Sequence, residues 1–93
     1  MSTRTVAVGS ASGLHARPAA LFVAAAQAAP VPVTIATSDK GPVPAGSMLA
    51  VMSLGAAQGT EVTLAAEGPG AEAALDGLAE LIAKDLDADG SDV

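Results

Sequence analysis

The 93-residue chain has no cysteine, tryptophan or tyrosine, and its single aromatic residue is Phe22. Without cysteine it forms no disulfide and offers no thiolate ligand, which is compatible with a reducing compartment. One histidine and scattered carboxylates show no metal-ligand spacing either. We therefore expect no metal site and no cofactor.

Basic residues are also few. Four lysines and arginines stand against ten acidic residues, for a formal net charge of −6. The charge is uneven, because residues 1–66 hold three bases and two acids whereas residues 67–93 hold one base and eight acids. Nucleic acid is not an expected partner, since its phosphate backbone binds a basic face.

Long apolar runs are missing as well. No stretch approaches 18 uninterrupted apolar residues, and the N-terminus lacks the basic region, apolar core and cleavage site of a signal peptide. We expect a cytoplasmic protein with no membrane insertion. The length fits a single domain over residues 1–88, with a frayed tail over residues 89–93.

The one histidine, His15, lies at the predicted start of a helix. The alanine-rich sequence predicts this helix over residues 16–28, and Pro18 suits its first turn because proline there removes no intrahelical hydrogen bond. The amides of Ala16 and Arg17 would then point outward with no intrahelical acceptor. Together with the helix dipole, they favour an anion at this place.

His15 is interpreted as a phosphoryl acceptor. Gly13 lets the backbone turn sharply before the helix, Ser12 helps to shape the loop, and Arg17 supplies a charged fork that suits phosphate oxygens. The helix N-terminus and the guanidinium both disfavour the imidazolium, so we expect a neutral, nucleophilic imidazole near pH 7. The alternative is a plain helix cap beside a solvated arginine.

The rest of the chain alternates strands and helices. Strands are predicted over residues 3–8, 31–37, 42–44 and 60–66, and further helices over residues 47–54 and 71–86. Four short strands, with helices that can cover only one face, predict an α+β fold of two layers, an open-faced sandwich. Periodicity alone does not fix the strand order.

Two motifs carry a resemblance to a known family. The segment 13–20, Gly-Leu-His-Ala-Arg-Pro-Ala-Ala, is followed by Ser47 to Gly55 and by Gln58-Gly59. This pattern resembles the histidine-containing phosphocarrier protein HPr of the bacterial phosphoenolpyruvate-dependent sugar phosphotransferase system, and it covers nearly the whole chain. The resemblance implies an antiparallel sheet of four strands in the order 1-4-2-3, covered on one face by three helices.

The resemblance also implies a phosphocarrier, a transferase intermediate rather than a stand-alone catalyst. His15 would accept a phosphoryl group on Nδ1 from a phosphohistidine of enzyme I and pass it to the A component of a sugar-specific transporter, supporting sugar transport. The Arg17 guanidinium and the amides of Ala16 and Arg17 would hold the phosphate oxygens. No separate cofactor is implied.

A carrier must bind several partners, so we expect an apolar docking patch near the reactive group. Its candidate residues lie on the first two predicted helices: Ala20, Leu21, Met48, Leu49 and Met52. Methionine adapts to different partners. The alternative is that these side chains pack in the core, as we expect for Val51 and Leu54.

Ser47 matches the serine that an HPr kinase phosphorylates in some family members, and the alternative there is a plain helix cap. Three other functions remain open for the chain. It could be a regulatory HPr paralogue acting through protein contacts, a carrier with a phosphopantetheine arm on Ser47, or a binding domain in which His15 is only a cap. We expect a monomer, because a small carrier serves several partners.

Overall fold

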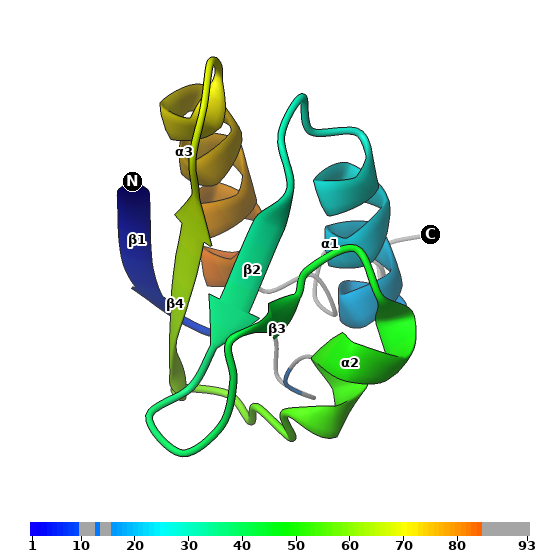
Figure 1. Cartoon of the computed structure of the whole chain (residues 1–93). Coiled ribbons are helices and arrows are strands. Elements are labelled where there is room, and N and C mark those ends of the chain that lie inside the picture. Colours follow the sequence, from blue (N-terminus) through cyan, green and yellow to red (C-terminus); the bar gives the residue numbers. More distant parts are fainter. Residues whose placement is uncertain (10–12, 14–15, 85–93) are drawn as a thin grey trace.

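The computed structural model describes residues 1–9, 13 and 16–84 (Figure 1). The elements follow the predicted order: β1 (Ser2–Ala7), α1 (Ala16–Gln27), β2 (Val33–Ala36), β3 (Val43–Pro44), α2 (Met48–Ser53), β4 (Glu61–Ala66) and α3 (Ala71–Ala83). The predicted tail over residues 89–93 and the predicted end of the last helix, including Leu86, lie outside the described residues.

The strands form one antiparallel sheet in the order β1-β4-β2-β3, which confirms the predicted order. Figure 1 shows the four strands side by side, with α3 behind the sheet and with α1 and α2 on the right. β4 lies at the centre, where Val62 pairs with Val6 of β1 and Leu64 pairs with Ile35 of β2. β3 has only two residues, in a segment where Pro42 and Pro44 have no amide hydrogen to donate to a neighbouring strand.

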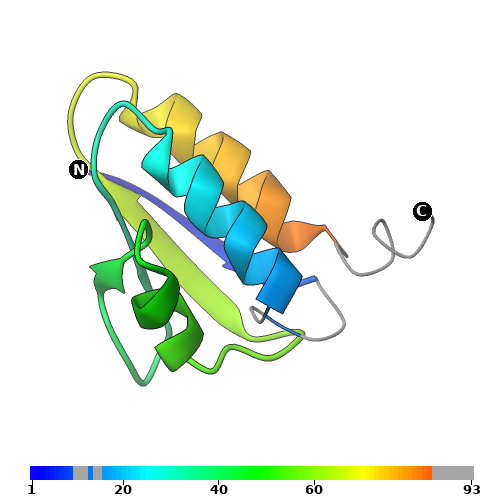
Figure 2. The same ribbon diagram turned by 90° about the vertical axis from the view of Figure 1, so that its right-hand side faces the viewer.

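Alternation along the strands separates the two layers. In β4, Val62, Leu64 and Ala66 are buried whereas Glu61 and Thr63 are exposed. Figure 2 shows α1 and α3 side by side over the same face of the sheet. The predicted α+β open-faced sandwich is therefore confirmed. Among the described residues, no helix has the length and apolar character that crossing a membrane requires.

The core is built from small and medium side chains, with Phe22 as its only aromatic residue. Phe22 is fully buried, and so are Ile35, Val51, Val62 and Leu64. Leu54 is also buried, so the expectation that Val51 and Leu54 pack in the core is confirmed. Burial of these apolar side chains supplies most of the favourable free energy of folding in a domain that lacks disulfides.

The last helix packs through the apolar stripe that the sequence predicts. Its buried residues are Ala71, Leu75, Leu78 and Ile82. One ion pair joins it to β1, because Arg4 Nε lies 2.7 Å from Asp76 Oδ1, but these side chains are 34% and 59% exposed. An exposed pair of this kind contributes about 0 to 1 kcal/mol, so the apolar stripe holds α3 in place.

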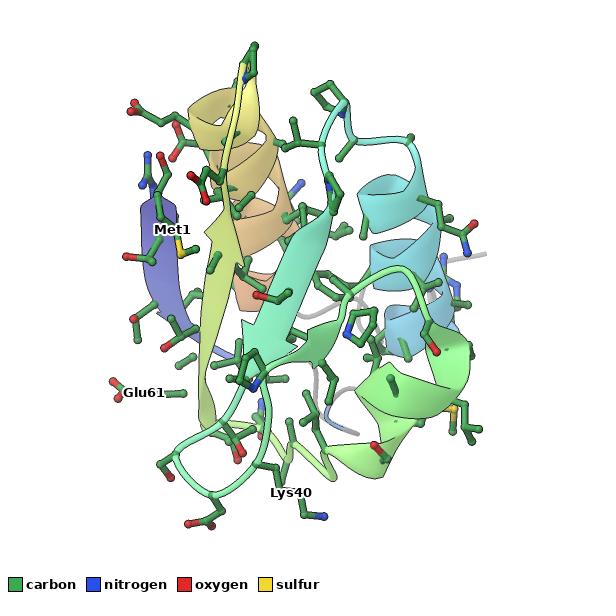
Figure 3. All side chains as sticks on the ribbon, viewed as in Figure 1. Met1, Lys40 and Glu61 are labelled. Carbon is green, nitrogen blue, oxygen red and sulfur yellow. The ribbon has the colours of Figure 1, made fainter. Side chains whose placement is uncertain are left out.

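A second polar contact ties the turn between β2 and β3 to the end of α2. Lys40 Nζ donates a hydrogen bond to the carbonyl oxygen of Ser53 over 3.0 Å, and Figure 3 shows Lys40 on this turn. At the start of α2, Ser47 is the N-cap and its Oγ accepts a hydrogen bond from the amide of Ala50 over 3.3 Å. Both ends of this six-residue helix are thus held by side chains.

Where both boundaries lie in the described residues, they differ from the predicted ones by at most two residues. β1 begins at Ser2 and ends at Ala7, so Val8 follows the strand. β2 begins only at Val33, because Pro32 has no amide hydrogen to donate to a neighbouring strand. The predicted end of α1 at Ala28 lies one residue beyond Gln27, although the Ala28 amide still donates to the carbonyl of Ala24.

Replacing Phe22 by alanine should lower the free energy of unfolding by about 3–5 kcal/mol, because a fully buried aromatic side chain leaves a cavity. Leu49→Ala is the control, since Leu49 is 83% exposed. We expect a change within about 0.5 kcal/mol for the control. Urea denaturation followed by circular dichroism measures both values, and a small loss for Phe22→Ala would contradict this account of the core.

Candidate functional site

β1 is followed by the segment that carries the histidine. Val8 and Gly9, directly after the strand, form hydrogen bonds with two other parts of the chain. The amide of Val8 donates to the carbonyl of Thr60 over 3.0 Å, and the amide of Gly59 donates to the carbonyl of Val8 over 2.8 Å. The next residue, Gly9, donates its amide hydrogen to the carbonyl of Ile82 over 2.9 Å. β1, the connection before β4 and the end of α3 therefore meet at this point.

Gly13 lies at the other end of the same segment and is buried. Its φ of 76° is in the left-handed region, which glycine adopts readily and other residues rarely adopt. A Cβ at this position would lie 2.4 Å from the carbonyl oxygen of Ala56 and 2.9 Å from the Cα of Ala57. The backbone at Gly13 therefore lies directly against the connection between α2 and β4.

The first turn of α1 has the composition that the sequence predicts for it. The helix begins at Ala16, and Pro18 is the third residue. Pro18 and Ala19 are buried whereas Arg17 is exposed. Packing of Pro18 and Ala19 into the core fixes the start of the helix, and Arg17 reaches solvent from that fixed start.

Two predicted site residues, Ser12 and His15, lie outside the described residues. The sequence places His15 directly before Ala16, the first residue of α1. It also places His15 two residues after Gly13, whose position is described. The structure thus describes the chain at Gly13 and from Ala16 onward, before and after His15 in sequence.

The apolar residues expected in the docking patch divide into two groups. Ala20, Leu21 and Leu49 are exposed, and Leu49 reaches 83%. Met48 and Met52 are half-buried and pack against the core. All five lie on α1 and α2, which contact each other. The alternative that Leu49 is a core residue is therefore wrong, whereas Met48 and Met52 lie at the boundary between core and surface.

Charge is nearly absent from these two helices. Arg17 is the one charged residue in the sequence of α1, and α2 has none. Electrostatic attraction to partners over this surface is therefore weaker than on a lysine-rich one.

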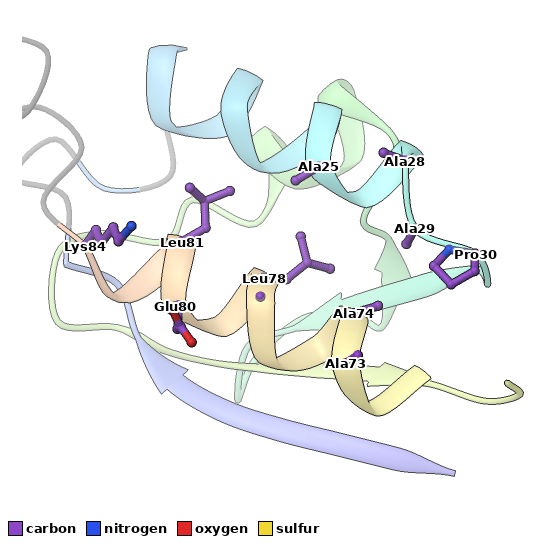
Figure 4. A pocket seen from close by; sticks show the side chains of 11 residues that line it. Ala25, Ala28, Ala29, Pro30, Ala73, Ala74, Leu78, Glu80, Leu81 and Lys84 are labelled. Atoms are coloured by element: carbon purple, nitrogen blue, oxygen red, sulfur yellow. The ribbon is translucent and has the colours of Figure 1, made fainter. Parts of the chain in front are cut away.

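A groove of about 410 Å³ lies elsewhere, between α1 and α3 (Figure 4). It is lined mostly by alanine, glycine, proline and leucine, and Glu80 and Lys84 are the only ionisable residues among its described lining. On α1 it involves the second half of the helix and the residues after it, from Ala25 to Pro30. This groove is therefore separate from the start of α1. No group of three or more metal-ligating side chains occurs in residues 1–9, 13 and 16–84.

Two residues of this region, Gly9 and Gln58, are not among the predicted site residues. Gln58 belongs to the Gln58-Gly59 motif, and its Nε2 donates to the carbonyl oxygen of Gly9 over 3.1 Å. Gly9 directly follows the predicted strand over residues 3–8, and a Cβ there would lie 2.0 Å from the carbonyl oxygen of Ala83. A glycine placed directly after a strand was the one available signal.

Known proteins share this sequence and this fold. Residues 2–84 match the family described as "PTS HPr component phosphorylation site". The chain is 59% identical to phosphocarrier protein HPr of Streptomyces coelicolor over 87 residues, which are 94% of this chain and 94% of that protein. It is 48% identical to phosphocarrier protein HPr of Haloferax volcanii over 80 residues, 85% of this chain and 90% of that protein.

A solved structure of a phosphocarrier protein HPr is also similar to this chain. The phosphocarrier protein HPr from Bacillus anthracis has a TM-score of 0.82 and 38% identity to this chain, covering 87% of this chain and 95% of that one. At this identity and coverage, the similarity extends over most of both chains. The chain therefore belongs to the HPr family, the phosphocarrier proteins of the phosphotransferase system.

Proposed function

We propose that His15 carries the phosphoryl group, accepting it from phospho-enzyme I and passing it to sugar-specific A components in support of sugar uptake. The observation that carries the proposal is the start of α1 at Ala16, the residue directly after His15. A helix N-terminus presents amide hydrogens and a positive partial charge to an anion. Arg17, exposed in the first turn, adds a full positive charge.

Transfer to this chain is a displacement at phosphorus. The lone pair of neutral Nδ1 of His15 attacks the phosphorus while the bond to the donor's histidine nitrogen breaks, and that nitrogen keeps the electron pair. In the second transfer the acceptor of the A component attacks, and the electron pair of the breaking bond returns to His15. The reaction needs positioning and charge stabilisation more than covalent chemistry.

Several residues around His15 contribute to the two transfers. The Arg17 guanidinium and the backbone amides of Ala16 and Arg17 hold the phosphoryl oxygens in both transfers. Pro18 fixes the first turn from the core side, where it is buried. Gly13 and Ser12 shape the loop that precedes the histidine.

Partners dock on the apolar side chains of α1 and α2. Exposed Leu21 and Leu49 supply area that is free for contact, and Met48 and Met52 add polarisable surface at its base. Because these helices carry little charge, partner binding depends on shape and apolar contact with weak salt dependence. The carrier acts in the cytoplasm as a monomer.

Ser47 lies at the N-terminus of α2, next to Met48 of this patch. A phosphate placed there by an HPr kinase would add about −1.5 to −2 charges at a helix end that tolerates anions. Modification would therefore weaken docking and leave the fold intact.

Phosphorylation of the intact chain by enzyme I and phosphoenolpyruvate should give one acid-labile, base-stable adduct, as expected for a phosphohistidine. His15→Ala should remove the adduct completely, because the nucleophilic nitrogen is lost. Ser47→Ala is the matched control and should be labelled like the unmodified chain. Labelling of His15→Ala, or loss of the label in Ser47→Ala alone, would contradict the assignment.

Leu49→Glu should raise the KM of enzyme I for this carrier about tenfold, because it places a charge in an apolar contact. The kcat should change little, since the reacting group is unaltered. Ala73→Glu is the control: it also places an acid in the first turn of a helix, at an exposed position of α3. An equal KM for the two variants would show that partners do not bind α2.

A further inference from the structure

Gly9 is the point at which the chain leaves the sheet towards the histidine, and both of its backbone polar groups are engaged. Its amide hydrogen is donated to the carbonyl of Ile82 over 2.9 Å, and its carbonyl oxygen accepts from Gln58 Nε2 over 3.1 Å. A Cβ at Gly9 would lie 2.0 Å from the carbonyl oxygen of Ala83. The peptide at Gly9 is therefore held between the end of α3 and the side chain of Gln58.

Gly13 is held by the same connection that carries Gln58. The close neighbours of Gly13 are Ala56 and Ala57, one and two residues before Gln58. One short segment, residues 54–60 between α2 and β4, thus contacts the chain on both sides of residues 10–12. We refer to it as the clamp segment.

The clamp segment is itself well anchored. Leu54 and Ala56 are buried in the core. The amide of Ala57 donates to Thr60 Oγ1 over 3.2 Å, and the amide of Thr60 donates back to the carbonyl of Ala57 over 3.0 Å. The amide of Gly59 bonds to Val8 of the sheet. These contacts anchor the clamp segment, and Gly9 and Gly13 lie against it.

Gln58 is the one exposed side chain of the clamp segment with a hydrogen bond to Gly9. Ordering a long exposed side chain costs conformational entropy, so such a bond adds little to the stability of the fold. The hydrogen bond from Gln58 instead acts locally, because it fixes the orientation of the peptide at Gly9. Phosphoryl transfer is sensitive to displacements of about 1 Å at the reacting group.

We propose that Gln58 is a positioning residue for phosphoryl transfer at His15: its amide fixes the peptide at Gly9, and the clamp segment fixes Gly13, two residues before His15. The inference rests on the proposed role of His15. Gln58 touches neither the phosphoryl group nor the imidazole in this account. It acts through the backbone at Gly9.

The chain offers a matched control for this hydrogen bond. Gln27 is also exposed, and its Nε2 also donates to a glycine carbonyl, that of Gly46, over 2.8 Å. It lies at the end of α1, twelve residues after His15 in sequence. Gln58→Met and Gln27→Met therefore remove the same type of bond from two different places and retain a side chain of similar length.

The test measures phosphorylation of the full-length variants by phospho-enzyme I. Gln58→Met should lower kcat about three- to tenfold, the effect expected for one lost hydrogen bond that orients the reacting group. KM should stay within about twofold, because the docking patch is untouched. Gln27→Met should leave kcat unchanged, and both variants should show the same small change in Tm.

Gly13→Ala probes the second contact of the clamp segment, the one with Gly13. It should lower kcat at least as much as Gln58→Met, because the added Cβ displaces the backbone from Ala56. If this variant does not fold, Gln58→Met still decides the question. An unchanged kcat for Gln58→Met, a rise in KM alone, or an equal fall in kcat for Gln27→Met would overturn the positioning role.

Failure of the inference can be told apart from failure of the proposed function. If His15→Ala is not labelled and Gln58→Met has the kcat of the unmodified chain, His15 remains the acceptor and Gln58 has no positioning role. If His15→Ala is labelled, the acceptor lies elsewhere, and the inference falls with the proposed function.

Discussion

The packing of α1 against the sheet is the constraint on which the rest of the structure depends. Pro18, Ala19, Phe22 and Val23 are all buried, so the first half of the helix is held by the core along its inner side. A helix anchored in this way cannot shift its first turn without exposing apolar surface, at about 25 cal/mol per Å². The N-terminus of α1, where we propose that the phosphoryl group is held, is therefore fixed by hydrophobic burial.

The sequence was sufficient to predict features that depend on local patterns. Alternation in β4 and the apolar spacing in α3 each led to the correct element, because the periods of 2 and 3.6 residues reflect burial on one side. The serine cap of α2 was equally readable, since Ser47 bonds an amide only three residues away. The strand order, by contrast, came from the resemblance to HPr, because no local pattern states which strands are neighbours.

The site was predictable only in its local part. The sequence indicated the start of α1, Pro18 in its first turn and the exposed arginine, all within a few residues of His15. It did not indicate the bond between Gln58 and Gly9, which joins residues 49 positions apart. Nor did it indicate the contact of Gly9 with Ile82, since a glycine can mark a turn, a close approach or both, and only the fold distinguishes these.

The proposed docking patch shows a compromise between packing and contact. Leu49 is 83% exposed and contributes almost nothing to the core, whereas Met48 and Met52 partly serve it. Exposed leucine lowers solubility unless a partner covers it, so its presence on α2 is consistent with a surface that binds other proteins. The methionines next to it can adjust their rotamers to different partners while the core beneath stays filled.

The arrangement of α1 and α3 keeps the acids at the start of α3 away from the start of α1. Four described acids of the C-terminal part are exposed: Glu67, Glu72, Asp76 and Glu80. The start of α3 lies beside the end of α1, since Ala73 and Ala74 share a groove with Ala28, Ala29 and Pro30. The twelve residues of α1 span about 18 Å, more than twice the Debye length of about 8 Å at physiological salt. The acids at the start of α3 are therefore screened from the end of α1 where Arg17 lies.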